Sequence, residues 1–244
     1  MFCWVKSFTV LTLFAAIFTP LAGDDAVAGE SPPLTVVELF TSQGCSSCPP
    51  ADTYLGDLAK SGEGENVLAL SYHVDYWDNL GWKDPYSSAD NSNRQRAYAH
   101  HMDLRYVYTP QMVVQGALQA TGSDRRTVAS QIKEARKLPR IYVELVRNGN
   151  DLQIALADTG NAMKADVYMV VFDNEHVTKV KKGENRGKTI TNRNVVRALK
   201  HIGTWQGEAV SISSPLDESG DACAVIVQSR TSGAILGAAS VALN

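Results

Sequence analysis

After a short leader, the chain reads Thr35-Val-Val-Glu-Leu-Phe-Thr-Ser-Gln-Gly-Cys-Ser-Ser-Cys-Pro-Pro-Ala-Asp52. The part from Thr35 to Phe40 is a short, β-branched and apolar run, which is typical of a buried strand. Apolar side chains then recur at helical spacing between Pro49 and Lys60. We therefore expect Cys45 and Cys48 at the junction between a strand and the helix that follows it.

The segments that follow predict a sheet with an insertion. Val67–His73 is a second apolar strand one helix later, which favours a parallel strand–helix–strand unit. Residues 74–108 are aromatic and polar, with a helix expected over Ala89–Met102, and predict an insertion over one end of the sheet. Its aromatic side chains should mainly pack the insertion onto the domain, with a minority around the cysteines. Tyr108–Gly116 predicts a strand entering a tight hairpin, and residues 124–137 predict a helix.

The sequence pattern changes near Pro139, where short apolar runs begin to alternate with turn residues. The strands expected there are Ile141–Arg147, Leu152–Ala157, Val167–Phe172, Val177–Lys181, Ala209–Ile212, Ala222–Gln228 and Ala234–Ala242. Strands at this spacing predict a small β-sandwich. The expected fold class is thus α/β, with residues 29–138 as a first domain carrying the insertion and residues 139–244 as a smaller β-rich domain. The first domain alone is expected to retain the chemistry.

The beginning of the chain predicts export. Lys6 precedes a short apolar run from Ser7 to Phe18. That run has about 12 residues, whereas a membrane span needs roughly 20, so it indicates a signal peptide. We expect residues 1–28 to be removed by cleavage after Ala28, with cleavage after Ala22 as the alternative. The mature protein should then be periplasmic or secreted, without stable membrane insertion.

Composition narrows the function classes. The net charge is −3, which creates no strong field for nucleic acid or a membrane surface, and the hydrophobic content of 44% argues against disorder. Three of the four cysteines follow the signal peptide: Cys45, Cys48 and Cys223. A disulfide-stapled scaffold would use more cysteines at wider spacing. Cys223 lies in an apolar strand and is expected to be a buried, inert thiol. The close spacing of Cys45 and Cys48 therefore indicates a chemical role for these two residues.

The spacing of the pair suits redox chemistry. Two thiols separated by two residues can close a disulfide when their Cα atoms come within roughly 7 Å, as the first turn of a helix allows. The helix N-terminus also stabilises a thiolate and lowers the pKa of the first cysteine. We expect Cys45 to be the partly exposed nucleophile and Cys48 to be the shielded thiol that resolves a mixed disulfide. This chemistry requires no cofactor.

Around the pair, the sequence resembles the thioredoxin-like superfamily, from about Leu34 to Lys137. In that fold a cis-proline loop lies beside the Cys-x-x-Cys pair, and Pro110 matches this proline. The resemblance implies that the Thr109–Pro110 bond is cis and that Pro110 positions the backbone of a partner. Thioredoxins also carry a buried acid on the strand before the cysteines. Glu38 matches that acid if the loop is one residue longer, which implies a proton relay; the alternative is an outward-facing strand residue.

A narrower resemblance covers nearly the whole mature chain. Residues 37–52, together with Tyr72-His-Val-Asp-Tyr-Trp77 and Gly183-Glu-Asn-Arg-Gly187, are similar to the bacterial secreted family DUF1223, a domain of unknown function. The resemblance implies export and a thioredoxin-like fold. The Trp-Cys-Gly-Pro-Cys of ordinary thioredoxins is replaced by Gly44-Cys-Ser-Ser-Cys48, which weakens the expectation of a general reductase. We expect residues 183–187 to form a loop structured by its own polar side chains.

Three hypotheses of function remain open from the sequence. The first is a periplasmic thiol–disulfide oxidoreductase acting on protein thiols or disulfides, as an oxidase, reductase or isomerase. The second is a copper- or zinc-binding protein, in which His73 at the end of its strand joins Cys45 and Cys48; such a histidine is more often a hydrogen-bonded structural residue. The third is a binding module in which the pair forms a permanent structural disulfide.

Overall fold

The structure is a computed structural model that describes Met1, residues 33–216 and residues 219–243. The predicted signal peptide and its two cleavage sites, after Ala28 and Ala22, lie outside the described residues. Residues 32–244 form one compact unit. Within the described part of the chain, no helix combines the length and the apolar character that a membrane crossing requires.

The strand–helix–strand unit predicted around the cysteines is present. It consists of β1 (Thr35–Thr41), α1 (Pro49–Glu65) and β2 (Val67–His73), and β1 and β2 are parallel. The elements that follow are η1 (Asp78–Leu80), α2 (Ala89–His101), β3 (Gln111–Val114), β4 (Leu118–Thr121), α3 (Arg125–Ala135), β5 (Val143–Asn148), β6 (Asp151–Leu156), β7 (Ala165–Lys179), β8 (Thr189–Trp205), β9 (Val210–Pro215), β10 (Ala222–Ser229) and β11 (Ile235–Ala242).

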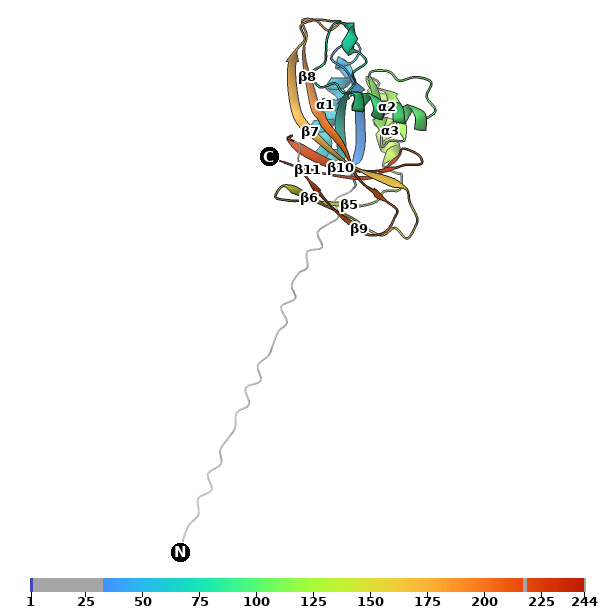
Figure 1. The fold of residues 1–244 in the computed structure, drawn as a ribbon, viewed down its shortest axis with the longest axis vertical. Helices are drawn as coiled ribbons and strands as arrows, with labels where there is room; N and C mark the ends of the chain where they lie inside the picture. Colours follow the sequence, from blue (N-terminus) through green and yellow to red (C-terminus); the bar gives the residue numbers. More distant parts are fainter. Residues whose placement is uncertain (2–32, 217–218, 244) are drawn as a thin grey trace. The chain divides into compact units, whose positions relative to one another are not determined.

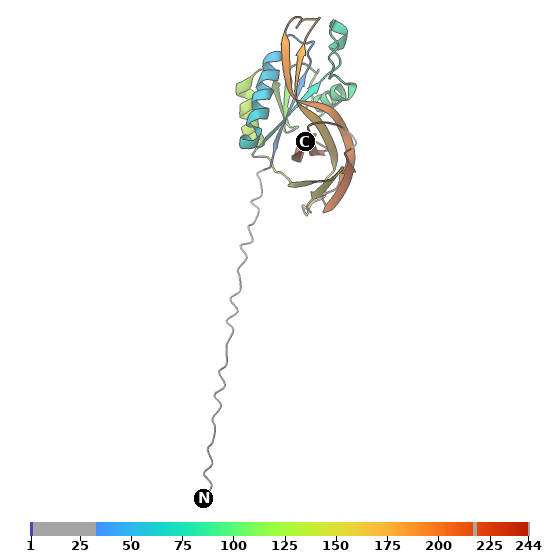
Figure 2. The ribbon, with the colours of Figure 1, turned by 90° about the vertical axis from the view of Figure 1, so that its left-hand side faces the viewer.

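The strands form a large mixed sheet and a small antiparallel one. The large sheet has eight strands in the order β11-β10-β7-β8-β2-β1-β3-β4, and the small sheet has the order β5-β6-β9 (Figure 1). Figure 2 shows α1 and α3 lying together on one side of the strands of the first half. The fold is therefore of α/β character, with helices on both faces of its N-terminal strands.

Strand β1 is buried on both faces, which explains its continuous apolar sequence. Val37 and Leu39 pack with α1 and α3, whereas Val36 and Phe40 pack with Tyr98 of α2. Side chains of a strand alternate between its two faces, so Glu38 lies on the α2 side and is fully buried there. Glu38 therefore lies on the face of β1 that is covered by α2, and not on the face that is covered by α1.

The predicted second domain is not confirmed as a separate unit. β7 unites two predicted strands, and β8, which the sequence analysis missed, pairs with β7 along its length. β8 also joins β2 through Ser71 and Val195, so four strands of the second half extend the sheet of the first. β8 was missed because it is rich in threonine, asparagine, lysine and arginine and shows little apolar alternation. Only β5, β6 and β9 form a sheet of their own.

Gln115 ties the two halves of the chain together. It forms the predicted β3–β4 turn with Gly116, and both residues have positive φ. The Gln115 side chain accepts a hydrogen bond from the Val36 N–H at 3.0 Å and donates one to the Ile235 carbonyl at 2.7 Å. The Ile235 N–H donates to the Gln115 carbonyl at 2.9 Å. β1, the β3–β4 turn and β11 are therefore held by one buried amide.

Candidate redox site

The two cysteines form a disulfide at the start of α1, as the sequence predicts. Their Cα atoms are 5.5 Å apart. The N–H groups of Ala51 and Asp52 donate to the Cys48 carbonyl at 2.8 and 3.0 Å, so the helix begins directly behind Cys48. The disulfide thus lies where unpaired helix N–H groups favour a thiolate.

The expectation that Cys45 is partly exposed is wrong, because both cysteines are fully buried. Ser46 and Ser47, which lie between them, are exposed. The Ser47 hydroxyl oxygen is 3.3 Å from Cys45 Sγ. The backbone between the cysteines therefore faces solvent while both sulfur atoms are covered.

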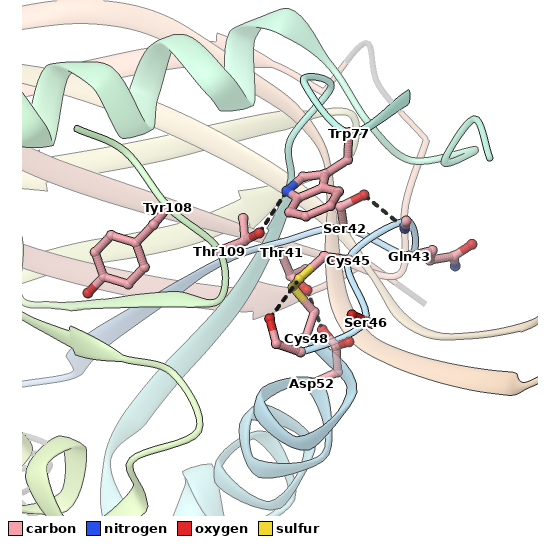
Figure 3. The surroundings of a disulfide bond; sticks show 12 residues. Thr41, Ser42, Gln43, Cys45, Ser46, Cys48, Asp52, Trp77, Tyr108 and Thr109 are labelled. Atoms are coloured by element: carbon pink, nitrogen blue, oxygen red, sulfur yellow. Dashed lines mark hydrogen bonds between the residues drawn. A yellow bond between two sulfur atoms is a disulfide. The ribbon is translucent and has the colours of Figure 1, made fainter. Parts of the chain in front are cut away.

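Trp77 of the insertion lies beside the cysteine loop and connects it to the proline loop (Figure 3). Its indole N–H donates to the Thr109 hydroxyl at 2.8 Å. Gly44 approaches it so closely that an added Cβ would lie 3.3 Å from Trp77 Cβ. The Thr109–Pro110 bond is cis, as the resemblance implies, and Pro110 is buried. One aromatic side chain of the insertion thus rims the disulfide, as expected of a minority of them.

The cysteine loop is also contacted by the second half of the chain. The tip of the β7–β8 hairpin, residues 183–187, was expected to be structured by its own side chains, but it binds the cysteine loop. Glu184 Oε2 accepts from the Ser46 N–H at 3.0 Å, and hydrogen bonds from Ser46 lower the pKa of this carboxyl. The buried Asn185 amide donates to the carbonyls of Gln43 and Cys45 at 3.0 and 2.8 Å. Local sequence could not reveal contacts between segments about 140 residues apart.

Glu38 is a buried acid on the strand before the cysteines, and both of its carboxylate oxygens are engaged by α2. Arg94 Nε donates to its Oε1 at 2.6 Å, and the Tyr98 hydroxyl donates to its Oε2. These partners belong to α2, on the face of β1 opposite α1. The outward-facing alternative is wrong because Glu38 is fully buried, in an ion pair that joins β1 to α2. The proton relay stays a prediction.

Asp52 is the acid beside the cysteines, and the sequence analysis missed it. It is four residues after Cys48 on α1 and is 4% exposed. The Thr41 hydroxyl donates to its Oδ1 at 2.8 Å, while its Oδ2 has no hydrogen-bond partner. Burial raises the pKa of this carboxyl to about 7, against the lowering effects of His73, of Thr41 and of the nearby Asn192 amide. An acid one helical turn after Cys48 was the available sequence signal.

His73 and Asp84 form a buried pair next to Asp52. His73 Nδ1 is 2.7 Å from Asp84 Oδ2, which also accepts from the Gln43 N–H at 2.7 Å. Burial alone would lower the pKa of His73, but the Asp84 carboxylate outweighs it and raises that pKa. Burial would raise the pKa of Asp84, but His73 outweighs it and lowers that pKa.

The predicted metal site of Cys45, Cys48 and His73 finds no support in this arrangement. Among the residues that the structure describes, no group of three or more His, Cys, Asp or Glu side chains could hold a metal ion. One ring nitrogen of His73 is already engaged by Asp84. Cys223, in contrast, fits its prediction: it is buried and unpaired, and burial raises the pKa of its thiol to about 12.

Comparisons with known proteins place the chain in a family. The model of DUF1223, a protein of unknown function, matches residues 36–228, so the chain belongs to this family. The crystal structure of protein AGR_C_4864 from Agrobacterium tumefaciens is 32% identical, covers 88% of this chain and 96% of its own, and has a TM-score of 0.75. HBP35 of Porphyromonas gingivalis is 11% identical over 87% of this chain and 76% of its own, with a TM-score of 0.57, and shows a likeness of fold alone. No curated protein matches the chain.

Proposed function

We propose that this chain is a thiol–disulfide oxidoreductase with a thioredoxin-like core, which acts on protein thiols or disulfides in the periplasm or outside the cell. The observation that carries the proposal is the Cys45–Cys48 disulfide at the first turn of α1. A helix N-terminus stabilises the thiolate that must attack or leave in disulfide exchange. The pattern of the first 28 residues supports export.

The surroundings of Pro110 support the thioredoxin-like interpretation. Pro110 directly precedes β3, and its N-terminal neighbour Thr109 binds Trp77 beside the cysteine loop. An added Cβ on Gly122 would lie 3.3 Å from Pro110 Cβ and 3.0 Å from Ala51 Cβ, so the proline loop and the first turn of α1 approach the same point. This placement allows Pro110 to position the backbone of a partner next to the sulfur atoms.

The reaction requires only the two cysteines and the substrate. In the reducing direction, the Cys45 thiolate attacks one sulfur of a substrate disulfide; a substrate thiolate leaves and is protonated by solvent. The Cys48 thiolate then attacks Cys45 Sγ, which releases the second substrate thiolate and forms the Cys45–Cys48 disulfide. Two electrons pass from the protein dithiol to the substrate. The oxidising direction is the reverse.

The burial of the cysteines adds one requirement to this reaction. A substrate sulfur must approach Cys45 in line with the bond that breaks, and Cys45 is fully covered in the oxidised protein. Trp77 packs against Gly44, and the β7–β8 tip holds the backbone of the cysteine loop through Glu184 and Asn185. Exchange therefore requires a movement of the cysteine loop or of the groups packed against it.

Equilibration with glutathione tests the proposal. The mature chain, residues 29–244, is incubated in buffers of increasing oxidised fraction, and free thiols are counted by alkylation and mass spectrometry. We expect Cys45 and Cys48 to change state together between the reduced and oxidised extremes, and a Cys223→Ser control to behave in the same way. Structural disulfides have potentials below about −300 mV and resist the glutathione pool. A pair that stays oxidised throughout would indicate the structural disulfide of the third hypothesis.

A further inference from the structure

Asp52 lies directly beneath the disulfide, on the first turn of the helix that Cys48 begins (Figure 3). Residues four apart on a helix lie on the same face, so the side chain of Asp52 is a neighbour of Cys48. The mechanism described above uses neither this carboxyl nor its surroundings. An acid buried next to a thiol that must lose a proton is placed to receive that proton.

His73 lies next to Asp52 across the sheet. Thr41 and His73 are partners in the parallel register of β1 and β2, and the Thr41 hydroxyl binds Asp52 Oδ1. Asp52 Oδ2 and His73 Nε2 are both buried and both lack a hydrogen-bond partner. Buried polar atoms are rarely left unpartnered in native structures, and such exceptions call for a functional reason. Asp52 Oδ2 and His73 Nε2 are therefore both available to accept or donate a proton.

A cleft of about 370 Å³ reaches Asp52 from outside. It lies between α1 and the β7–β8 hairpin and is lined by Asp52, Thr53, Gly56, Asp57, Lys60, Glu175, Thr191 and Arg193. The cleft approaches the acid from the side of α1, and neither Trp77, Ser46 nor Pro110 is among its lining residues. A proton can therefore leave Asp52 without crossing the surface that a substrate would occupy.

We propose that Asp52 accepts the proton of the Cys48 thiol in the resolving step and releases it to solvent through this cleft, with His73 and Asp84 as positioning residues. The inference rests on the proposed function and deepens it. As the S–H bond of Cys48 breaks, its proton passes to Asp52 Oδ2. The electron pair left on Cys48 Sγ forms the new bond to Cys45 Sγ, and the bond between Cys45 and the substrate sulfur breaks with its electron pair on the substrate. The opposite direction returns the proton to Cys48.

The charged groups around Asp52 set the pH range of this step. His73 and Asp84 face it from β2 and the insertion, and the first lowers its pKa while the second raises it. On the cleft side lie Asp57 and Lys60 of α1, together with the ion pair of Arg193 with Glu175. Burial is the largest effect and brings the pKa of Asp52 to about 7. The acid thus changes protonation state near neutral pH, where a base for a thiol is most effective.

The test follows the resolving step alone. The protein carrying glutathione on Cys45 is prepared, and release of glutathione by Cys48 is timed from pH 5 to pH 9. We expect the wild-type rate to rise with an inflection near pH 7, and Asp52→Asn to lose this inflection and react at least about tenfold more slowly at pH 7. The matched control is Asp57→Asn, which removes an exposed carboxylate from the same helix and cleft. It should keep the wild-type profile.

The positioning role of His73 is tested by the pH at which the inflection occurs. Since His73 lowers the pKa of Asp52, His73→Gln should move the inflection to higher pH without abolishing it. A purely structural histidine would change the rate at all pH values and leave the inflection in place. That result would remove the positioning role while leaving the role of Asp52 intact.

The outcomes separate the relay from the proposed function. If wild-type protein forms no mixed disulfide and no glutathione equilibrium, the oxidoreductase proposal fails. If it exchanges normally and Asp52→Asn keeps the inflection, the relay alone is wrong. Should Asp52→Asn fail to fold, carbon-13 NMR titration of the aspartate carboxyls in oxidised wild-type protein decides. A carboxyl titrating near pH 7 supports the relay, and the absence of any aspartate titrating above pH 6 overturns it.

Discussion

Two buried acids lie on opposite faces of the same strand region, and their surroundings differ. Glu38 is bound at both oxygens by Arg94 and Tyr98, so its charge is matched within the core. Asp52, which binds Thr41 at the end of β1, has one oxygen without a partner, and burial raises its pKa to about 7. The comparison teaches that burial alone does not mark a reactive acid. At Asp52 the effect of burial on the pKa exceeds the opposing effect of His73, whereas Glu38 has a guanidinium bound directly to its carboxylate.

The Glu38 side is built for rigidity. The Arg94 guanidinium also donates to Tyr98 and Gln228, at 2.9 and 3.2 Å, and lies over the Tyr72 ring at 5.4 Å from its centroid. Burial would lower the pKa of Arg94, but the charge of Glu38 and smaller effects of the two tyrosines together raise that pKa above its ordinary value. The guanidinium therefore stays charged across the ordinary pH range, and its hydrogen bonds link α2 to β1 and β10.

The largest effect should come from breaking this pair. Arg94→Met removes the cation and leaves Glu38 as a buried charge without its partner, which typically costs about 3–5 kcal/mol. We expect a loss of this size in the free energy of unfolding measured with urea at pH 7. The double variant Arg94→Met with Glu38→Gln should recover part of the loss. A loss below about 1 kcal/mol in the single variant would show that Glu38 is not held as described.

Asp52→Asn should increase the free energy of unfolding instead of lowering it, and the size of this increase should depend on pH. Because the folded pKa of about 7 exceeds the ordinary value of 3.8, both states are protonated below pH 3.8 and the acid then has no effect. Between these values the unfolded chain ionises first, and the acid destabilises the fold fully above pH 7. We expect Asp52→Asn to stabilise by roughly 2–4 kcal/mol at pH 8 and by almost nothing near pH 3. Thermal unfolding at both pH values checks this, and an equal effect at both would contradict it.

A smaller effect is expected at the β7–β8 tip. Asn185→Ala removes two hydrogen bonds to the cysteine loop, which should cost about 1–2 kcal/mol and uncover Cys45 more often. Reduction of the disulfide by dithiothreitol should then become several-fold faster, as followed by alkylation of the freed thiols. The neighbouring exposed side chain provides the control, Arg186→Ala. Equal rates in both variants would mean that the tip does not limit access.

The smallest effect should follow Glu38→Gln in the redox equilibrium. Because the Glu38 carboxylate is engaged by Arg94 and Tyr98 of α2, the equilibrium constant with glutathione should change by less than tenfold, or about 30 mV for two electrons. The wild-type protein measured in the same buffers is the reference. A larger shift would return Glu38 to the role that the thioredoxin resemblance implied.

Local sequence was sufficient for the first half of the fold. The apolar run before the cysteines predicted β1, the helical spacing after them predicted α1, and Gln115-Gly116 predicted the hairpin. Each of these signals arises within a few residues, where strand, helix and turn preferences act. The junction that holds Cys45 and Cys48 could therefore be placed correctly.

The rest of the site depends on contacts between distant segments. Asn192 of the polar strand β8 accepts a hydrogen bond from the Gln43 side chain at 3.0 Å, and Asn185 binds the same loop. Neither residue lies in an apolar pattern that predicts a buried position. The expectation that residues 29–137 suffice for the chemistry stays a prediction. A cut near Pro139 would remove these partners and the Ile235 partner of Gln115, which argues against it.

The β7–β8 tip also fixes an order of events during biosynthesis. A chain that emerges from its N-terminus exposes Cys45 and Cys48 long before Glu184 and Asn185, which later hold the same loop. During that interval neither contact exists. The backbone of the cysteine loop therefore reaches its final set of hydrogen bonds only after residues 184 and 185 have been made.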